Sequence, residues 1–154
     1  MKHTGNLEIT SGNAHLYAKL TEISGDLRVY GYARLDALQS VGGDLVVYGS
    51  ATLDAPALQS VGGDLRVNGS ATLDALQSVD GEDVSNGKIK FIETPVWIAI
   101  CTPKMLRIGC QRRTWEEWIG MSNDEIGSLD ENAAKIAKEY RAKLLKIHEE
   151  LKGQ

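Results

Sequence analysis

The stretch that decides the fold is Gly43-Asp44-Leu45-Val46-Val47, because close copies of it recur along the first half of the chain. Gly25-Asp26-Leu27-Arg28-Val29 begins 18 residues earlier, and Gly63-Asp64-Leu65-Arg66-Val67 begins 20 residues later. Each copy continues through Gly, Ala, Leu, Asp, Leu, Gln, Ser and Val. Degenerate copies begin at Gly5 and at Gly81. Self-similarity at such a period is typical of solenoids, in which each repeat forms one rung.

Apolar and polar residues alternate within each copy. Leu27 and Val29 flank Arg28, for example, and the same order recurs in the later copies. Alternation with a period of two over three to five residues predicts short strands, and the intervening glycines predict corners. One rung alone cannot bury its apolar side chains, but stacked rungs bury a continuous column and pair as parallel strands about 4.8 Å apart.

We therefore predict a mainly β protein whose first domain, residues 5–85, is a short right-handed parallel β-solenoid (β-helix) of about four to five rungs of 18–20 residues. The two extra residues of the longer interval are assigned to Ala55-Pro56-Ala57 and are expected to bulge at a corner. The alternative is a leucine-rich-repeat horseshoe with a helix in each unit. Units this short leave little room for a helix, and the Gln-Ser-Val-Gly-Gly stretch is a poor helix former.

The pattern changes after the repeats, and residues 86–154 are predicted to form a separate α+β cap. Strands are expected at 88–92, 96–101 and 105–108, the last two joined by a turn at Pro103. Solenoid ends expose unpaired strand edges and apolar core, so a cap meets a physical need.

Three capping-box signatures in this second segment predict helix starts. These are Thr114 with Glu117, Ser122 with Glu125, and Ser128 with Glu131. The last pair opens a long amphipathic helix that ends at Gly153. Its apolar stripe consists of Leu129, Ala133, Ile136, Tyr140, Leu144, Ile147 and Leu151.

Two stretches resemble known proteins. The Leu-Gln-Ser-Val-Gly-Gly-Asp-Leu-x-Val block, over about half of the chain, resembles leucine-rich solenoid repeats of bacterial and phage proteins of unassigned role. Residues 106–110, with 114–118 and 122–126, resemble the C-terminal module of small uncharacterised phage and prophage proteins, over residues 105–151. The second resemblance implies a mobile-element origin, and neither implies a catalytic residue.

The bulk composition argues against several partners. The chain has 154 residues, of which 42% are hydrophobic and 25% charged, and its net charge of −4 argues against general attraction to nucleic acid or anionic membranes. No stretch approaches the roughly 18 consecutive apolar residues of a membrane span. Residues 1–6 contain no apolar signal-peptide core, so a protein of the host-cell cytoplasm is expected.

The residue types that carry chemistry are scattered. Cys101 would face Leu106 across the predicted turn, not Cys110, so two reduced thiols are expected. His3, His15 and His148 lie in different segments and are expected to be solvated. The sequence contains no nucleotide-binding, metal-binding or nucleophile motif. We therefore expect no catalytic residue, no metal and no cofactor.

Aspartates recur at two positions of the repeat. One expected outer line consists of Asp36, Asp54 and Asp74, and the other of Asp26, Asp44 and Asp64. Like charges about 5 Å apart repel by about 1 kcal/mol per pair even in water, so the lines need an explanation. The carboxylates could cap turns by accepting backbone N–H groups, form an acidic surface, or hold a calcium ladder. Residues 1–81 contain nine acidic and five basic residues, which favours the acidic surface.

Tyrosines mark the best candidate contact face. Tyr30 and Tyr48 are expected at the same outward position of consecutive rungs, and Tyr32 lies just past the corner. Exposed tyrosine is common in protein interfaces, although an aromatic ladder that only stiffens the stack is the alternative. The predicted partner-binding residues are Arg28, Tyr30, Tyr32, Tyr48, Arg66, Asp36, Asp54 and Asp74.

These features together predict a non-enzymatic, protein-binding inhibitor, monomeric or homodimeric, encoded by a phage or mobile element. Its partner would be a host protein, and its sharpest form an anti-CRISPR or other inhibitor of a nucleic-acid-binding defence complex, whose basic channel an acidic rod can occupy. Direct binding to nucleic acid or membranes is not expected. The alternative function is a structural protein that stacks end to end through its first rung, and an enzyme ranks third.

Overall fold

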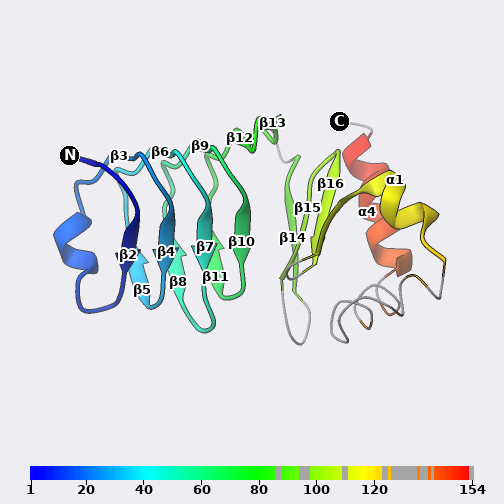
Figure 1. Ribbon diagram of the computed structural model, residues 1–154, viewed down its shortest axis with the longest axis horizontal. Helices are drawn as coiled ribbons and strands as arrows, with labels where there is room; N and C mark the ends of the chain where they lie inside the picture. Colours follow the sequence, from blue (N-terminus) through cyan, green and yellow to red (C-terminus); the bar gives the residue numbers. More distant parts are fainter. Residues whose placement is uncertain are drawn as a thin grey trace. The chain divides into compact units, whose positions relative to one another are not determined.

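The structure, a computed structural model, describes residues 1–85, 88–93, 98–108, 111–122, 125, 135, 139 and 141–152. By its internal contacts the chain divides into two compact units, Met1–Asn86 and Gly87–Gln154. Each unit is described by itself (Figure 1). None of the helices in the described residues has the length and apolar composition needed to cross a membrane.

The first unit is a β-solenoid of about four stacked coils built from three sheets (Figure 1). Sheet A runs in the order β1-β3-β6-β9-β12-β13, sheet B in the order β10-β7-β4-β2, and sheet C in the order β11-β8-β5. All pairs are parallel except β12 with β13. The strands of sheet A are Lys2–His3, Glu22–Ile23, Ser40–Val41, Ser60–Val61, Ser78–Val79 and Glu82–Asp83. Those of sheet B, from β2 to β10, are Leu7–Ile9, Leu27–Val29, Leu45–Val47 and Leu65–Val67. Those of sheet C, from β5 to β11, are Tyr32–Arg34, Thr52–Asp54 and Ser70–Thr72.

The alternating residues place their apolar side chains inside, as predicted. Leu45 pairs in register with Leu27 on one side and Leu65 on the other, and Leu45 has no exposed surface. The rival horseshoe required a helix in every unit. Residues 1–85 are all described, and they contain a single short 3-10 helix, η1 (Ala14–Tyr17), which takes the place of a sheet C strand in the first coil.

The predicted bulge at Ala55-Pro56-Ala57 is wrong. Two residues connect β4 to β5 and β10 to β11, whereas four connect β7 to β8, so the extra residues lie at Gly49-Ser50. Gly49 has a φ of +47°, which glycine adopts without strain. The sequence misled because residues 49–55 and 69–75 are identical and suggest a residue-by-residue match.

Core packing explains why the chain does not use that match. Leu53 lies between Ala33 and Ala71 in sheet C, so a large side chain stacks between two small ones. Two positions later in each coil, the small residue Ala55 lies between two leucines. Two hydrogen bonds fix this register, from Ala55 N–H to Thr72 O and from Leu35 N–H to Asp54 O. Each coil therefore contributes one leucine and one alanine, which fills the core evenly.

The repeat ends in a hairpin. Val79 pairs with Glu82 in the antiparallel pair of β12 and β13, and Asp80 and Gly81 between them have φ values of 50° and 76°. Two consecutive residues with positive φ are typical of the type I′ hairpin turn, for which Asp-Gly is a preferred sequence. The copy that begins at Gly81 therefore does not form a further rung, because it folds back on sheet A.

The second unit contains a four-stranded antiparallel sheet D, in the order β14-β15-β16-β17, with helices α1 (Trp115–Gly120) and α4 (Arg141–Lys152). The strands are Lys90–Glu93, Ile98–Cys101, Met105–Ile108 and Gln111–Thr114. The predicted first strand begins two residues later and ends one residue later than expected, and the fourth strand was missed. Cys101 faces Leu106 as predicted. Residues 96–97 and Cys110 lie outside the described residues.

Two of the three predicted helix starts are confirmed. Thr114 Oγ1 accepts the Glu117 N–H at 3.2 Å, and Ser122 Oγ accepts the Glu125 N–H at 3.1 Å. The third start at Ser128 lies outside the described residues, as do Glu131, Leu129, Ala133, Ile136, Tyr140 and Gly153.

The core of the second unit corrects the prediction for His148, which is not solvated. Its side chain is buried and stacks on the Trp115 ring, with centroids 4.5 Å apart and an interplanar angle of 13°. Position 148 follows Leu144 by four residues and so shares the face of the predicted stripe, on which Leu144, Ile147 and Leu151 are all buried. Burial lowers the pKa of His148, and the nearby Lys152 lowers it further.

Candidate functional site

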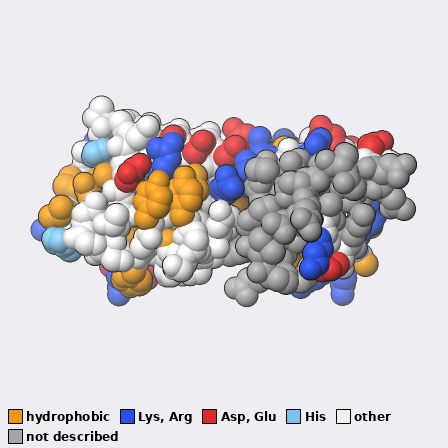
Figure 2. Space-filling view, turned by 60° about the horizontal axis from the view of Figure 1, so that its bottom comes forward, with side chains coloured by type: hydrophobic (Ala, Val, Ile, Leu, Met, Phe, Trp, Pro, Cys, Tyr) orange, Lys and Arg blue, Asp and Glu red, His pale blue; other side chains and the backbone are white. Residues whose placement is uncertain are grey.

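The outward side chains of sheet B and of the residues that flank its strands form a surface of three columns, which we call the tyrosine face. Rung pairing aligns the columns along the solenoid. They consist of Asn6, Asp26, Asp44 and Asp64; of Glu8, Arg28, Val46 and Arg66; and of Thr10, Tyr30, Tyr48 and Asn68. Figure 2 shows hydrophobic side chains gathered on the solenoid unit beside basic and acidic ones.

The third column contains the stacked tyrosines. The rings of Tyr30 and Tyr48 are parallel within 2°, with centroids 4.6 Å apart, as their predicted equivalence requires. The Tyr30 side chain is nevertheless well exposed, at 46%, and Tyr32 at the start of β5 is 56% exposed. The two extra residues, Gly49-Ser50, directly follow Tyr48 and are exposed. Aromatic rings and an irregular loop therefore share one corner of the solenoid.

The first column is a hydrogen-bonded ladder. Asp26 Oδ1 accepts the Asp44 N–H, and Asp44 Oδ1 accepts the Asp64 N–H, each at 2.8 Å. Asn6 Oδ1 accepts the Asp26 N–H at the same distance in the first coil. For this line, the interpretation that the carboxylates satisfy backbone N–H groups is therefore confirmed.

The ladder also explains the glycine that precedes each aspartate. A Cβ on Gly43 would overlap with Asp26 Oδ1, and a Cβ on Gly63 would overlap with Asp44 Oδ1. The carboxylate of one coil thus occupies the space that a side chain on the next coil would need. The recurring Gly-Asp pair is a single packing device that spans two rungs.

The second column contains charged residues, of which some have an ion-pair or hydrogen-bond partner among the described residues and others do not. Arg28 Nη2 lies 3.2 Å from Asp26 Oδ2, with both side chains partly buried. Arg66 Nε is buried without a hydrogen-bond partner among the described residues. The Glu8 side chain is exposed and has no ion pair within the described part of the chain. Four carboxylates and two guanidinium groups give the face a net charge of −2.

The other predicted acidic line is wrong. Asp54 pairs in register with Arg34 and Thr72, so Asp36, Asp54 and Asp74 do not stack. Asp36 instead forms an ion pair with Arg34, whose Nε lies 3.0 Å from Asp36 Oδ1. The error has the same origin as the misplaced bulge, because extra residues before β8, and not after it, shift β8 by two residues against the strands beside it.

The structure thus brings together four of the predicted site residues and separates the rest. Arg28, Tyr30, Tyr48 and Arg66 share the tyrosine face, and Tyr32 lies on the neighbouring sheet C. Sequence reasoning missed Glu8 and Thr10, although the degenerate copy at Gly5 aligns them with Arg28 and Tyr30.

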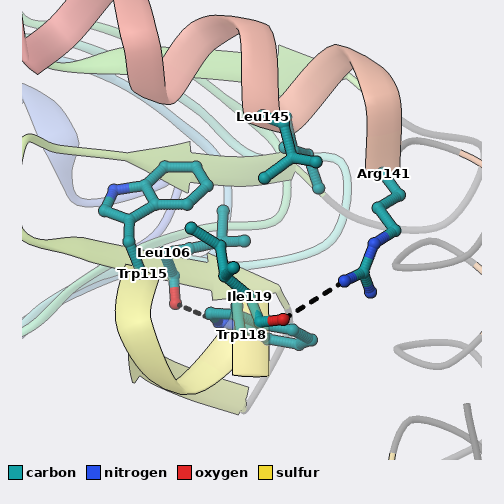
Figure 3. A pocket seen from close by; sticks show the side chains of 7 residues that line it. Leu106, Trp115, Trp118, Ile119, Arg141 and Leu145 are labelled. Atoms are coloured by element: carbon teal, nitrogen blue, oxygen red, sulfur yellow. Dashed lines mark hydrogen bonds between the residues drawn. The ribbon is translucent and has the colours of Figure 1, made fainter. Parts of the chain in front are cut away.

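The second unit offers a small apolar pocket between α1, α4 and β16 (Figure 3). Its free volume of about 20 Å³ is room for about one water molecule. Two hydrogen bonds join residues that line it: Trp118 Nε1 donates to Leu106 O at 3.2 Å, and Arg141 Nη2 donates to Ile119 O at 3.3 Å. The pocket is therefore a packing feature, too small for an organic ligand.

Metal ligands are not clustered in what the structure describes. Across residues 1–85 and the described parts of the second unit, no group of three or more His, Cys, Asp or Glu side chains is placed to hold a metal ion. Comparison with protein-family models, with curated proteins and with solved structures finds no match to the chain.

Proposed function

We propose that the protein is a non-enzymatic binding protein that docks its tyrosine face on a partner protein. The observation that carries the proposal is the stacked Tyr30–Tyr48 pair, in which Tyr30 is exposed and Tyr48 is half-buried, beside the exposed Gly49-Ser50 loop. Tyrosine provides a large contact area with few rotatable bonds, and it is enriched among residues that dominate binding energy.

The rigidity of the surface supports the proposal. The stack holds both rings in one orientation, and the aspartate ladder fixes the backbone beneath them. Side chains that are already ordered lose little entropy on binding, so more of the contact energy is available for affinity. The net charge of the face favours a partner with a basic surface.

The alternative function, end-to-end stacking through the first coil, is disfavoured by the edge of β2. Asn13 Oδ1 accepts the Thr10 N–H at 2.8 Å, Asn13 Nδ2 donates to Glu8 O at 3.2 Å, and His3 Nε2 donates to Asn6 O at 3.0 Å. Side chains thus occupy backbone groups that an added strand would need.

The finer predictions remain part of the proposal. We take the solenoid to be right-handed, with rungs of 18–20 residues, because that hand and size suit the short strands and glycine corners. Inhibition of a host defence complex by a phage-encoded or mobile-element protein in the cytoplasm stays a prediction, supported by the acidic face alone. A direct capture experiment can identify the partner.

The test compares two double variants in affinity capture from host lysate with mass spectrometry. Tyr30→Ala with Tyr48→Ala removes the stack, and each loss is expected to cost about 1–2 kcal/mol of binding if the rings are central. Gln39→Ala with Gln59→Ala is the matched control, since it removes exposed side chains from the same two coils at another corner. A partner captured equally by both variants would refute the proposal.

A further inference from the structure

One side of the Tyr30 ring has no stacking partner among the aromatic residues that the structure describes. Tyr48 covers the other side. Beyond the open side, the column continues with Thr10, whose short side chain leaves the ring exposed. Neighbouring rungs are about 4.8 Å apart, which is close to the separation of two stacked planar groups. The end of the stack therefore has room for one flat side chain above Thr10.

The charge at this end of the stack is negative. Glu8 lies in the neighbouring column, is exposed, and has no ion pair among the described residues. Partial desolvation raises the pKa of the Tyr30 phenol and Glu8 raises it further, whereas Arg28 acts in the opposite direction. Arg28 is, however, paired with Asp26 at 3.2 Å, so among the described residues Glu8 is the unpaired charge at this end. The opposite end of the stack differs, because Asn68 follows Tyr48 there and Arg66 takes the place of Glu8. Glu8 thus favours a cation at the Tyr30 end, whereas Arg66 disfavours one at the Tyr48 end.

We infer that Glu8, Thr10 and the open side of Tyr30 form a binding place for an arginine side chain of a protein partner. A guanidinium group is flat, carries a permanent positive charge, stacks on aromatic rings and pairs with carboxylates. A lysine ammonium group lacks the flat shape, and an aromatic side chain lacks the charge. The inference rests on the proposed function, because it names the group that the partner contributes at one end of the tyrosine face.

The probe is Nα-acetyl-arginine amide, titrated into the full-length protein and followed by NMR, with Nα-acetyl-lysine amide as the comparison. We expect saturable shifts of the Tyr30 ring and Glu8 side-chain signals. The arginine probe should bind about two- to fivefold more tightly than the lysine probe. Glu8→Gln should weaken the arginine probe by a similar factor, about two- to fivefold, and reduce the salt dependence of its binding.

Two tyrosine substitutions give a matched pair. Thr10→Tyr extends the stack at the Tyr30 end and should abolish binding of the arginine probe by filling the place. Asn68→Tyr extends the stack at the Tyr48 end and should leave binding unchanged. Equal affinity for the two probes, shifts that do not involve Tyr30, or equal effects of the two tyrosine substitutions would overturn the inference.

The failure of this inference can be distinguished from failure of the proposed function. If a captured partner is lost on Tyr30→Ala with Tyr48→Ala but is retained by Glu8→Gln and Thr10→Tyr, the tyrosine face binds without the arginine place. If the probe behaves as expected but a captured partner is insensitive to loss of the tyrosines, the arginine place exists and the proposed function is wrong.

Discussion

The aspartate ladder predicts that Asp44 and Gly63 are energetically coupled. Asp44 Oδ1 accepts the Asp64 N–H at 2.8 Å, and the same oxygen fills the space of a Cβ on Gly63. Because a hydrogen bond to a charged group contributes about 1.5–3 kcal/mol, Asp44→Ala should destabilise the solenoid by about that amount. Gly63→Ala should cost at least as much, since the new methyl group displaces the carboxylate and breaks the same bond.

The double variant Asp44→Ala with Gly63→Ala tests this coupling directly. With Asp44 already truncated, the Cβ at position 63 no longer meets the carboxylate, and its next contacts are Gly43 C at 3.0 Å and Asp44 N at 3.1 Å. The hydrogen bond is lost only once, so the two substitutions should be non-additive by about 1.5–3 kcal/mol.

Urea unfolding followed by far-UV circular dichroism gives the free energies, and amide exchange at Asp64 reports the hydrogen bond directly. Asp44→Asn is the control, because Asn6 makes the equivalent bond with an amide oxygen. It should change stability by less than about 0.5 kcal/mol. Additive free energies for the two alanine substitutions, or full protection of the Asp64 amide in Asp44→Ala, would refute the ladder.

Three further predictions follow from the core, the first coil and the second unit. Leu45→Asp should unfold the solenoid, because an unpaired buried charge costs several kcal/mol; a soluble, cooperatively folded variant by circular dichroism would contradict the inward leucine column. Asn13→Ala frees the Thr10 N–H and Glu8 O, so it should increase concentration-dependent association in sedimentation experiments, and an unchanged profile would remove the edge-protection argument. Because the folded-state pKa of His148 lies below its usual value of 6.5, the unfolded chain binds the proton first, and stability of the second unit should fall as pH drops through that value. Tryptophan-detected unfolding should show this dependence in the native protein and not in His148→Phe.

The sequence predicted the class of fold well because the solenoid core is encoded by simple alternation. Leu27 and Val29, and their equivalents, needed only the period-two rule to be placed inside. The placement of the extra residues failed because side-chain size, not local similarity, sets the register: Leu53 stacks between Ala33 and Ala71. An alignment of the copies by sequence does not show that large and small side chains alternate from one coil to the next.

The same limit applied to the candidate site. Tyr30 and Tyr48 were found because equivalent residues of β4 and β7 are 18 positions apart in the sequence. Asp54 was misaligned because equivalent residues of the next pair of strands, β5 and β8, are 20 positions apart. His148 was misassigned because its polar side chain concealed its position on the apolar face. Burial of a polar aromatic ring depends on what packs against it, and Trp115 lies 33 positions earlier in the chain.

Some positions of the repeat maintain the fold and others do not, and the aspartate ladder and the apolar core show which are which. Glycine, aspartate and the inward leucine and valine recur because each is needed by the rung beside it. The column of Thr10, Tyr30, Tyr48 and Asn68 varies although its backbone is equivalent in every coil, so its side chains are not required for stacking. The one coil with extra residues places them next to this column. Two costly features, an aromatic stack with an exposed end at Tyr30 and an added loop, thus coincide where the fold needs neither, as the proposed binding role predicts.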